Sequence, residues 1–259
     1  MSKLQEKLEK VNKALSTSMS GFGFLAAHAK EPTMLIMSSL REPDKSLASS
    51  CIEKGADEVL LSCTEATVSK VKGLVENLTV PWGIEVDELS SDSLSSISKA
   101  GADFLGIKVE APASVLADEN LGRLLHITVD NVEDSDLRTM SGLRLDAVAV
   151  ELPQALSVGG IAFVLRIAML TGKPVLVEIS KQELSSAELQ VLRDAGVKGI
   201  LFNIGSKSDV DRLSKLRKLI DDLPQRAKRA DRGGASALVP QAVMPREVPP
   251  TRPEPDEDE

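Results

Sequence analysis

Several apolar segments of this chain end in charged or polar residues. The stretch DFLGIKVEAP has the composition of a buried strand until it reaches Lys108 and Glu110. Because an unpaired charge is costly to bury, these two residues favour a polar site over a continuous apolar core. Other apolar segments end in the same way, at Glu85, His126, Glu151, Glu178 and Asn203.

Two kinds of chemistry would use such a set. Carboxylates around a lysine keep its ammonium group charged, so Lys108 is expected to act as an acid or an electrostatic catalyst, with Glu85 or Glu178 as the base. We therefore predict a catalytic set of Lys108, Glu85, Glu178, His126 and Glu151.

A divalent metal is the alternative chemistry. Glu85, Glu151, Glu178 and His126 carry ligand atoms that such an ion accepts, and Asn203 would lie nearby. The histidine spacings typical of zinc sites are absent from the sequence. The residues favour a site without a metal and leave the cofactor undetermined.

Each of these residues also has a purely structural interpretation. Glu110 could cap the helix that follows it, and His126 could be a core histidine bonded to a carbonyl oxygen. The glutamates and Lys108 could form an ion-pair network. The recurrence of polar residues at one position of successive segments is the reason for preferring a site.

The elements that position these residues follow one repeated pattern. A short apolar run is followed by helix-capping residues, an amphipathic segment and often a glycine, as in KAGADFLGI and DAGVKGILF. The pattern predicts eight strands, at 33–40, 57–63, 81–89, 103–110, 123–130, 146–153, 174–180 and 199–205. The segment after the fourth strand, APASVLADENLG, is compatible with a short helix or a loop.

Strands that alternate with helices indicate parallel pairing, and eight such units predict a (β/α)8 TIM barrel. An open doubly wound sheet is disfavoured because no glycine-rich phosphate-binding motif follows the first strand. Alternate residues of a barrel strand point inward, and active sites form at the carboxyl ends of the strands. By this parity the polar residues named above share one barrel end.

Residues 1–20 are predicted to hold an extra helix before the barrel at 21–224. Leu4, Leu8, Val11 and Leu15 recur at helical spacing and form one apolar face. Such a helix could cover the bottom of the barrel or pair with another subunit, and covering is the preferred interpretation.

Two stretches, KPVLVEISKQELSSAELQVLRDAGVKGILFNIGS and VPWGIEVDELSSDSLSSISKAGADFLGI, resemble units of phosphate-binding TIM barrels such as indole-3-glycerol-phosphate synthase. The resemblance implies a phosphate site after the last two strands. The glycine pair usual after strand seven is replaced here by EISKQE, whereas Gly205 and Ser206 still offer backbone N–H groups at a helix start. We assign substrate binding to Asn203, Gly205, Ser206 and Arg41. The alternative for the stretch GSKSD is a glycine turn followed by serine and aspartate helix caps.

The composition disfavours some classes of binding partner. The net charge of -8 and the 2% aromatic content disfavour nucleic acid. No segment has the length and apolar character of a membrane span or signal core, which predicts a cytoplasmic protein. Residues 225–259 are rich in proline and charge and are predicted to be a disordered tail that is either solvated or binds a protein partner.

The sequence therefore predicts a TIM-barrel enzyme, a lyase or isomerase acting on a small anionic metabolite, with phosphorylated compounds as one option. The alternative is a barrel without catalysis that serves as a scaffold or homo-oligomer through its first helix and its tail. A flavin- or other cofactor-binding barrel ranks third, because the expected phosphate loops are poor.

Overall fold

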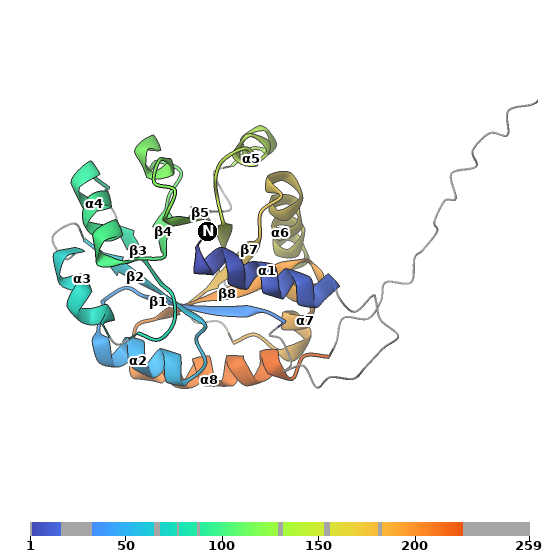
Figure 1. Cartoon of the computed structure of the whole chain (residues 1–259). Coiled ribbons are helices and arrows are strands. Elements are labelled where there is room, and N and C mark those ends of the chain that lie inside the picture. Colours follow the sequence, from blue (N-terminus) through green and yellow to red (C-terminus); the bar gives the residue numbers. More distant parts are fainter. Residues whose placement is uncertain are drawn as a thin grey trace, which may run out of the picture. The chain divides into compact units, whose positions relative to one another are not determined.

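Eight parallel strands close into a barrel in which each strand pairs with its sequence neighbours and β8 pairs with β1 (Figure 1). The structure is a computed structural model, and it describes residues 2–16, 33–64, 68–76, 78–86, 89–128, 132–152, 156–180 and 183–224. The strands are β1 Leu35–Leu40, β2 Glu58–Cys63, β3 Trp82–Val86, β4 Phe104–Ile107, β5 Gly122–Ile127, β6 Ala147–Glu151, β7 Val175–Ile179 and β8 Val197–Ile204. The predicted fold class is confirmed.

Helices follow the strands in the expected order. They are α1 Lys3–Ser16, α2 Lys45–Glu53, α3 Val68–Val75, α4 Ser91–Ala100, α5 Asp134–Met140, α6 Val158–Thr171, α7 Ser186–Asp194 and α8 Lys207–Asp221. The ambiguous segment after β4 contains a short 3-10 helix, η3, at Ala113–Leu116. Capping explains the boundaries: Ser90 accepts a hydrogen bond from the Ser93 N–H at the start of α4, and Gly101 ends the helix with a left-handed φ of 86°.

Strand β4 is shorter than predicted, because it ends at Ile107 and not at Glu110. The Lys108 carbonyl accepts a hydrogen bond from the Ala111 N–H, which turns the chain away from the sheet. Pro112 follows, and proline has no N–H with which to continue a ladder. Lys108 and Glu110 therefore sit in the loop at the carboxyl end of β4.

The barrel interior is filled by one apolar cluster. It comprises Leu4, Leu8, Val11, Leu35, Met37, Leu60, Phe104, Leu124, Ala147, Ala149, Leu176 and Leu201. Phe104 crosses this layer and lies against Gly83, where an added Cβ would stand 2.3 Å from the Phe104 ring. A larger core between the strands and the outer helices contains the residues of opposite parity, such as Ile84 and Val177.

Helix α1 covers the amino-terminal end of the barrel. Its residues Leu4, Leu8 and Val11 complete the interior cluster. The Lys3 and Leu4 N–H groups donate to the Asp103 carboxylate at 2.8 and 2.9 Å, just before β4. The structure thus shows α1 covering the bottom of the barrel, as preferred from the sequence. The polar cavity described below lies at the other end of the barrel.

Three further features bear on the sequence predictions. Within the described residues, no helix is long and apolar enough to cross a membrane. Both cysteines, Cys51 and Cys63, are free thiols and buried. The predicted tail, 225–259, lies outside the described residues.

Candidate active site

A cavity of about 620 Å³ opens at the carboxyl ends of the strands. This is the barrel end at which the active sites of such folds form. Its lining is mostly polar and consists of Ser39, Arg41, Ser62, Glu85, Lys108, Val109, Glu110, His126, Ile127, Thr128, Val132, Glu151, Glu178 and Asn203.

The structure brings most of the predicted site residues together. All five residues of the predicted catalytic set line the cavity, together with Asn203 and Arg41. Five of them come from strands β3, β5, β6, β7 and β8, and Lys108 and Arg41 come from the loops after β4 and β1. The five strand residues line the cavity as the parity of the sequence predicts. Gly205 and Ser206 do not line it. The chemical roles of all nine residues stay predictions.

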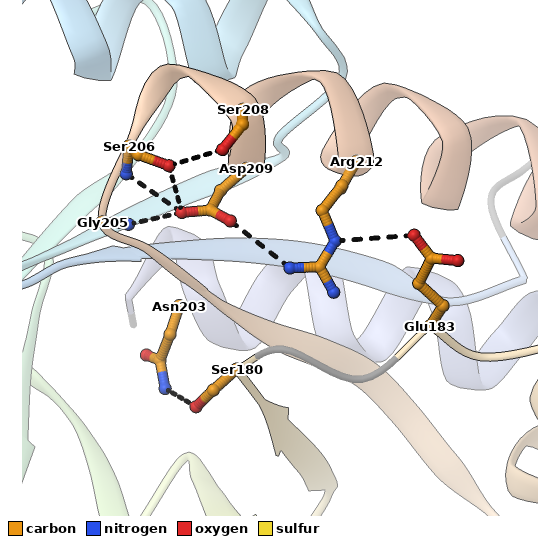
Figure 2. Close-up of polar contacts among 8 residues, drawn as sticks. All are labelled: Ser180, Glu183, Asn203, Gly205, Ser206, Ser208, Asp209 and Arg212. Carbon is orange, nitrogen blue, oxygen red and sulfur yellow. Dashed lines mark hydrogen bonds and ion pairs between the residues drawn. The ribbon is translucent and has the colours of Figure 1, made fainter.

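A chain of polar contacts runs across the floor of the cavity. The Asn203 side-chain amide donates to Glu178 Oε1 at 2.8 Å and to Ser180 Oγ at 3.0 Å. Figure 2 shows the second of these contacts. On the far side of the same carboxylate, Glu178 Oε2 lies 3.5 Å from His126 Nδ1. Strands β8, β7 and β5 thus hold an amide, a carboxylate and an imidazole in series.

The other imidazole nitrogen has an unusual environment. His126 Nε2 is buried and has no hydrogen-bond partner among the described residues. The inward-facing Gly106 leaves space beside it: a Cβ there would lie 3.4 Å from His126 Nε2 and 3.1 Å from Glu85 Cβ. Any larger residue at 106 would crowd both side chains, so this glycine lets Glu85 and His126 approach each other.

The charges around His126 set its protonation. Burial alone would lower the pKa of His126, but the Glu178 contact and the carboxylates of Glu85 and Glu178 outweigh it and raise the pKa above the ordinary value of 6.5, against a small opposing effect of Lys108. For Glu178, burial acts to raise the pKa, and the bonds from His126 and Asn203 reverse this, so its pKa falls below the ordinary 4.5. The pair therefore favours an imidazolium beside a carboxylate.

The rest of the lining carries both signs of charge. The carboxyl groups are those of Glu85, Glu110, Glu151 and Glu178, and the basic side chains are those of Arg41 and Lys108. Arg41, Lys108, Glu110 and Glu151 are exposed at the rim, whereas Glu85 and Glu178 are half-buried on the floor. The rim thus carries two basic and two acidic side chains, so it would attract an anionic group of a ligand only beside Arg41 or Lys108.

The residues present do not fit the metal alternative. Over the described part of the chain, no three side chains of His, Cys, Asp or Glu lie together in an arrangement that could hold a metal ion. Glu178 already accepts from Asn203 and contacts His126, so its oxygens have internal partners.

The α8 amino terminus holds an internal anion. Asp209 Oδ2 accepts from the Gly205 N–H and the Ser206 N–H at 3.0 Å each, and from the Ser206 hydroxyl at 2.9 Å (Figure 2). Arg212 Nη1 lies 3.3 Å from the other oxygen of this carboxylate. The backbone donors that the sequence assigned to substrate are thus bonded to a carboxylate of the same chain.

Two serines of the strands, Ser39 and Ser62, line the cavity but were not among the predicted site residues. Their positions in the strands could have indicated them. Ser39 of β1 is buried, lies in phase with Arg41 and lines the cavity. Ser62 of β2 pairs in register with Glu85. Both are small hydroxyl residues, which carry a weaker sequence signal than a charge in an apolar segment.

Comparison with known proteins supports the fold. No protein-family model matches the sequence, and no curated protein matches it. The structure is similar to a mutant tryptophan synthase α-subunit from Pyrococcus furiosus, with a TM-score of 0.56 and 13% identity over 74% of this chain and 98% of that one. It is also similar to phosphoribosyl anthranilate isomerase from Thermus thermophilus, with a TM-score of 0.57 and 11% identity over 73% and 100% of the two chains.

A third similar structure is 3-hexulose-6-phosphate synthase, with a TM-score of 0.55 and 15% identity over 72% of this chain and 99% of that one. At such identities the likeness establishes a shared barrel fold and leaves the chemistry to the site itself. The resemblance to phosphate-binding barrels seen in the sequence is confirmed at this level.

Proposed function

We propose that this chain is an enzyme that transfers a proton on a small anionic metabolite, as a lyase or an isomerase. The main support for the proposal is His126 Nε2, which is buried and has no hydrogen-bond partner among the described residues. It lies near Glu85, on the floor of the polar cavity at the carboxyl end of the barrel. A buried polar nitrogen without a partner is rare in folded proteins and is compatible with a functional role.

The proposed roles follow from the contacts. Glu178 has a lowered pKa and two internal partners, which makes it a poor base and a good support for the imidazolium. Glu85 is the better base, since its stem lies beside the space at Gly106. A turn of Glu85 toward His126 Nε2 would give that N–H an acceptor and link substrate, Glu85 and His126 into one proton path.

The cations complete the proposed mechanism. When Glu85 removes a proton from a substrate carbon next to a carbonyl, negative charge develops on the carbonyl oxygen. Lys108 at the rim would stabilise that charge, and Arg41 would bind the anionic group of the substrate. Return of the proton to a neighbouring atom gives an isomerase, and loss of a leaving group gives a lyase.

A phosphate is the proposed anionic group. Two of the similar structures are named for phosphorylated compounds, phosphoribosyl anthranilate and hexulose-6-phosphate. Arg41 and Lys108 are also the side-chain types that phosphates attract. This support concerns the class of substrate and leaves the particular compound open.

Deuterium exchange tests the proposal whatever the final product of the reaction is. The protein is incubated in D2O with a panel of small phosphorylated aldehydes and ketones, and mass spectrometry measures deuterium gained at carbon. We expect at least one compound to exchange about 100-fold faster than without protein, and Glu85→Gln to abolish the gain.

The matched control is Glu53→Gln, which removes a carboxylate from the exposed surface at the end of α2 and should leave exchange unchanged. Exchange at the protein-free rate across the panel, or equal exchange by wild type and Glu85→Gln, would contradict the proposed reaction. A non-catalytic barrel would then be the better account.

A further inference from the structure

Helix α6 carries an apolar stripe on its outer side. Its inner side, including Phe163, Val164 and Ile167, is buried against the sheet as expected for a barrel helix. On the outer side, Val158 is 88% exposed, Met169 80% and Leu165 38%, and Ala162 between them is also exposed. Large apolar side chains that gather in one exposed patch mark an interaction surface more often than isolated ones do.

The stripe is free of charge. Arg166 is the only charged residue of α6, and it bonds to Asp134 of α5 and donates to the Val132 carbonyl at 3.1 Å. Its guanidinium also lies 5.9 Å from the centre of the Phe163 ring. The arginine is thus turned sideways toward α5, so a partner helix on the stripe would bury no unpaired charge of α6.

An apolar hollow continues the stripe toward α7. It has a volume of about 440 Å³ and lies between the amino-terminal half of α6 and α7. Its wall consists of Leu156, Ser157, Val158, Ile161, Ala187, Glu188 and Val191. Val191 is itself 48% exposed. The stripe and this hollow share Val158, and together they are called the α6 face below.

The spacing of the stripe is symmetric about its midpoint. Val158, Ala162, Leu165 and Met169 are separated by four, three and four residues. When two copies of such a helix pair antiparallel about a two-fold axis, Val158 of each faces Met169 of the other and Ala162 faces Leu165. The small Ala162 lets the two helices approach near the axis, and a bulky side chain opposes a smaller one at each level.

We propose that the α6 face is a homodimer interface in which a second copy of this chain packs its own α6 antiparallel across a two-fold axis. The match of a larger with a smaller side chain at each level, Met169 with Val158 and Leu165 with Ala162, favours a second copy over an unrelated partner.

The size of the face sets the expected affinity. A 14-residue helix is about 21 Å long, and stable dimers usually bury about 800 Å² per subunit. Four apolar residues and one hollow make a face at or below this size. We therefore expect a reversible dimer with a dissociation constant of about 1–100 µM.

Sedimentation velocity over this concentration range measures the equilibrium directly, on the full chain. We expect Met169→Glu to weaken the dimer about tenfold or more, because it buries a carboxylate against Val158 of the partner subunit. Met169 is largely exposed, so the change should leave the melting temperature of the monomer unaltered. Val109→Glu, at a 51% exposed position of the cavity rim, adds the same charge and should leave the dimer intact.

Cysteine pairing tests the antiparallel geometry. The double variant Val158→Cys, Met169→Cys should form a covalent dimer under mild oxidation, since each new thiol faces its counterpart in the other copy. The two positions lie about three turns apart on one helix and cannot pair within a chain. Either single variant should stay monomeric on a denaturing gel, because its thiol faces no thiol in the partner.

Three outcomes would overturn the proposal. A full chain that stays monomeric at about 100 µM, or a dimer that Met169→Glu leaves unchanged, would show that the α6 face does not join two copies. A monomeric full chain combined with a dimeric 1–224 fragment would assign the face instead to the segment after residue 224, which contains the apolar run ALVPQAVMP.

Discussion

Glu58 is a buried acid at the opposite end of the barrel from the cavity. It opens β2 at 1% exposure, and neither carboxyl oxygen has a hydrogen-bond partner among the described residues. Burial raises its pKa to about 8; Lys7 of α1 opposes this shift, and the nearby carboxylates of Asp103 and Asp57 add to it. The group is therefore protonated in the folded protein at neutral pH.

This acid makes the stability of the barrel depend on pH. Because its pKa is higher in the folded than in the unfolded state, its contribution is fully present below about pH 4.5 and is lost as the pH rises through about 8. Glu58→Gln keeps the shape and cannot ionise. We expect it to raise the melting temperature at about pH 8 and to change it little at about pH 5.

The control is Glu53→Gln, which alters an exposed carboxylate close in sequence. An equal shift of the melting temperature by Glu58→Gln at the two pH values would mean that Glu58 is not protonated in the folded state. The proposed pH dependence of the stability would then be wrong.

Lys108 separates a functional from a structural interpretation of the cavity. In a structural network its loss would leave buried carboxylates uncompensated, at a cost of about 3–5 kcal/mol. The structure places Lys108 exposed at the rim, where solvent screens its contacts. We therefore expect Lys108→Met to change the free energy of unfolding by less than about 1 kcal/mol and to slow deuterium exchange into the responsive compound by about 100-fold.

Thermal melts at about pH 7 and about pH 5, together with the deuterium-exchange assay, check this expectation. Carboxylates are closer to neutral at the lower pH. A large loss of stability of Lys108→Met at neutral pH that becomes smaller at the lower pH would therefore support the structural network. It would count against the proposed role of Lys108.

At the scale of elements, the α8 amino terminus shows how an anion site can be filled from within. Burial acts to raise the pKa of Asp209, but hydrogen bonds from Gly205 and Ser206 outweigh it and lower the pKa below the ordinary 3.8. The resulting stabilisation is present above the ordinary pKa and is lost as the pH falls through the lower folded value. Asp209→Ala should cost about 1 kcal/mol, as for other capping residues.

The same change frees the Gly205 and Ser206 N–H groups for an external anion. We expect inorganic phosphate to raise the melting temperature of Asp209→Ala more than that of wild type. Asp211→Ala, at an exposed position of the same helix, is the matched control. An equal response of all three proteins would show that this helix start does not select anions, even when the carboxylate is removed.

Much of the architecture could be predicted from the sequence because strands and helices repeat with clear periodicity. The parity of alternate strand residues correctly indicated that Glu85, His126, Glu178 and Asn203 point inward. The predicted end of β4 was wrong, because a turn that follows a strand leaves no periodic signal in the sequence. At GSKSD the structure shows the alternative of a glycine turn with helix caps, in which the Asp209 side chain accepts from the Gly205 N–H.

Glu58 and Gly106 were missed for a different reason. A glutamate at the start of an apolar run has the sequence pattern of an exposed strand end, but Glu58 is buried at the barrel end that α1 covers. Gly106 matters because of the space it leaves between two side chains from other strands. Such features arise from tertiary contacts, which one sequence does not display.

At the scale of the whole molecule, the described residues contain a complete barrel core. Both apolar clusters are built from residues between Leu4 and Leu223. We therefore expect truncation after residue 224 to change the free energy of unfolding by less than about 1 kcal/mol. Urea unfolding of the two proteins at equal, low concentration measures this, and a larger loss would mean that the segment beyond 224 contributes to the fold.

The proposed proton transfer depends on the ionisation of one side chain. The chain has only two histidines, and His28, which lies outside the described residues, provides an internal reference. NMR of isotope-labelled histidine gives the pKa of His126 directly. Burial lowers the pKa of His126, but the Glu178 contact and the carboxylates of Glu85 and Glu178 outweigh it, so we predict a pKa above 6.5.

The titration of His126 in wild type, Glu178→Gln and Glu85→Gln is the most direct test of the proposed proton-transfer site. We predict that Glu178→Gln lowers the pKa of His126 below 6.5, because burial then dominates, and that Glu85→Gln lowers it by a smaller amount. A wild-type pKa of His126 below 6.5, or a value that neither substitution moves, would contradict the proton path from Glu85 through His126.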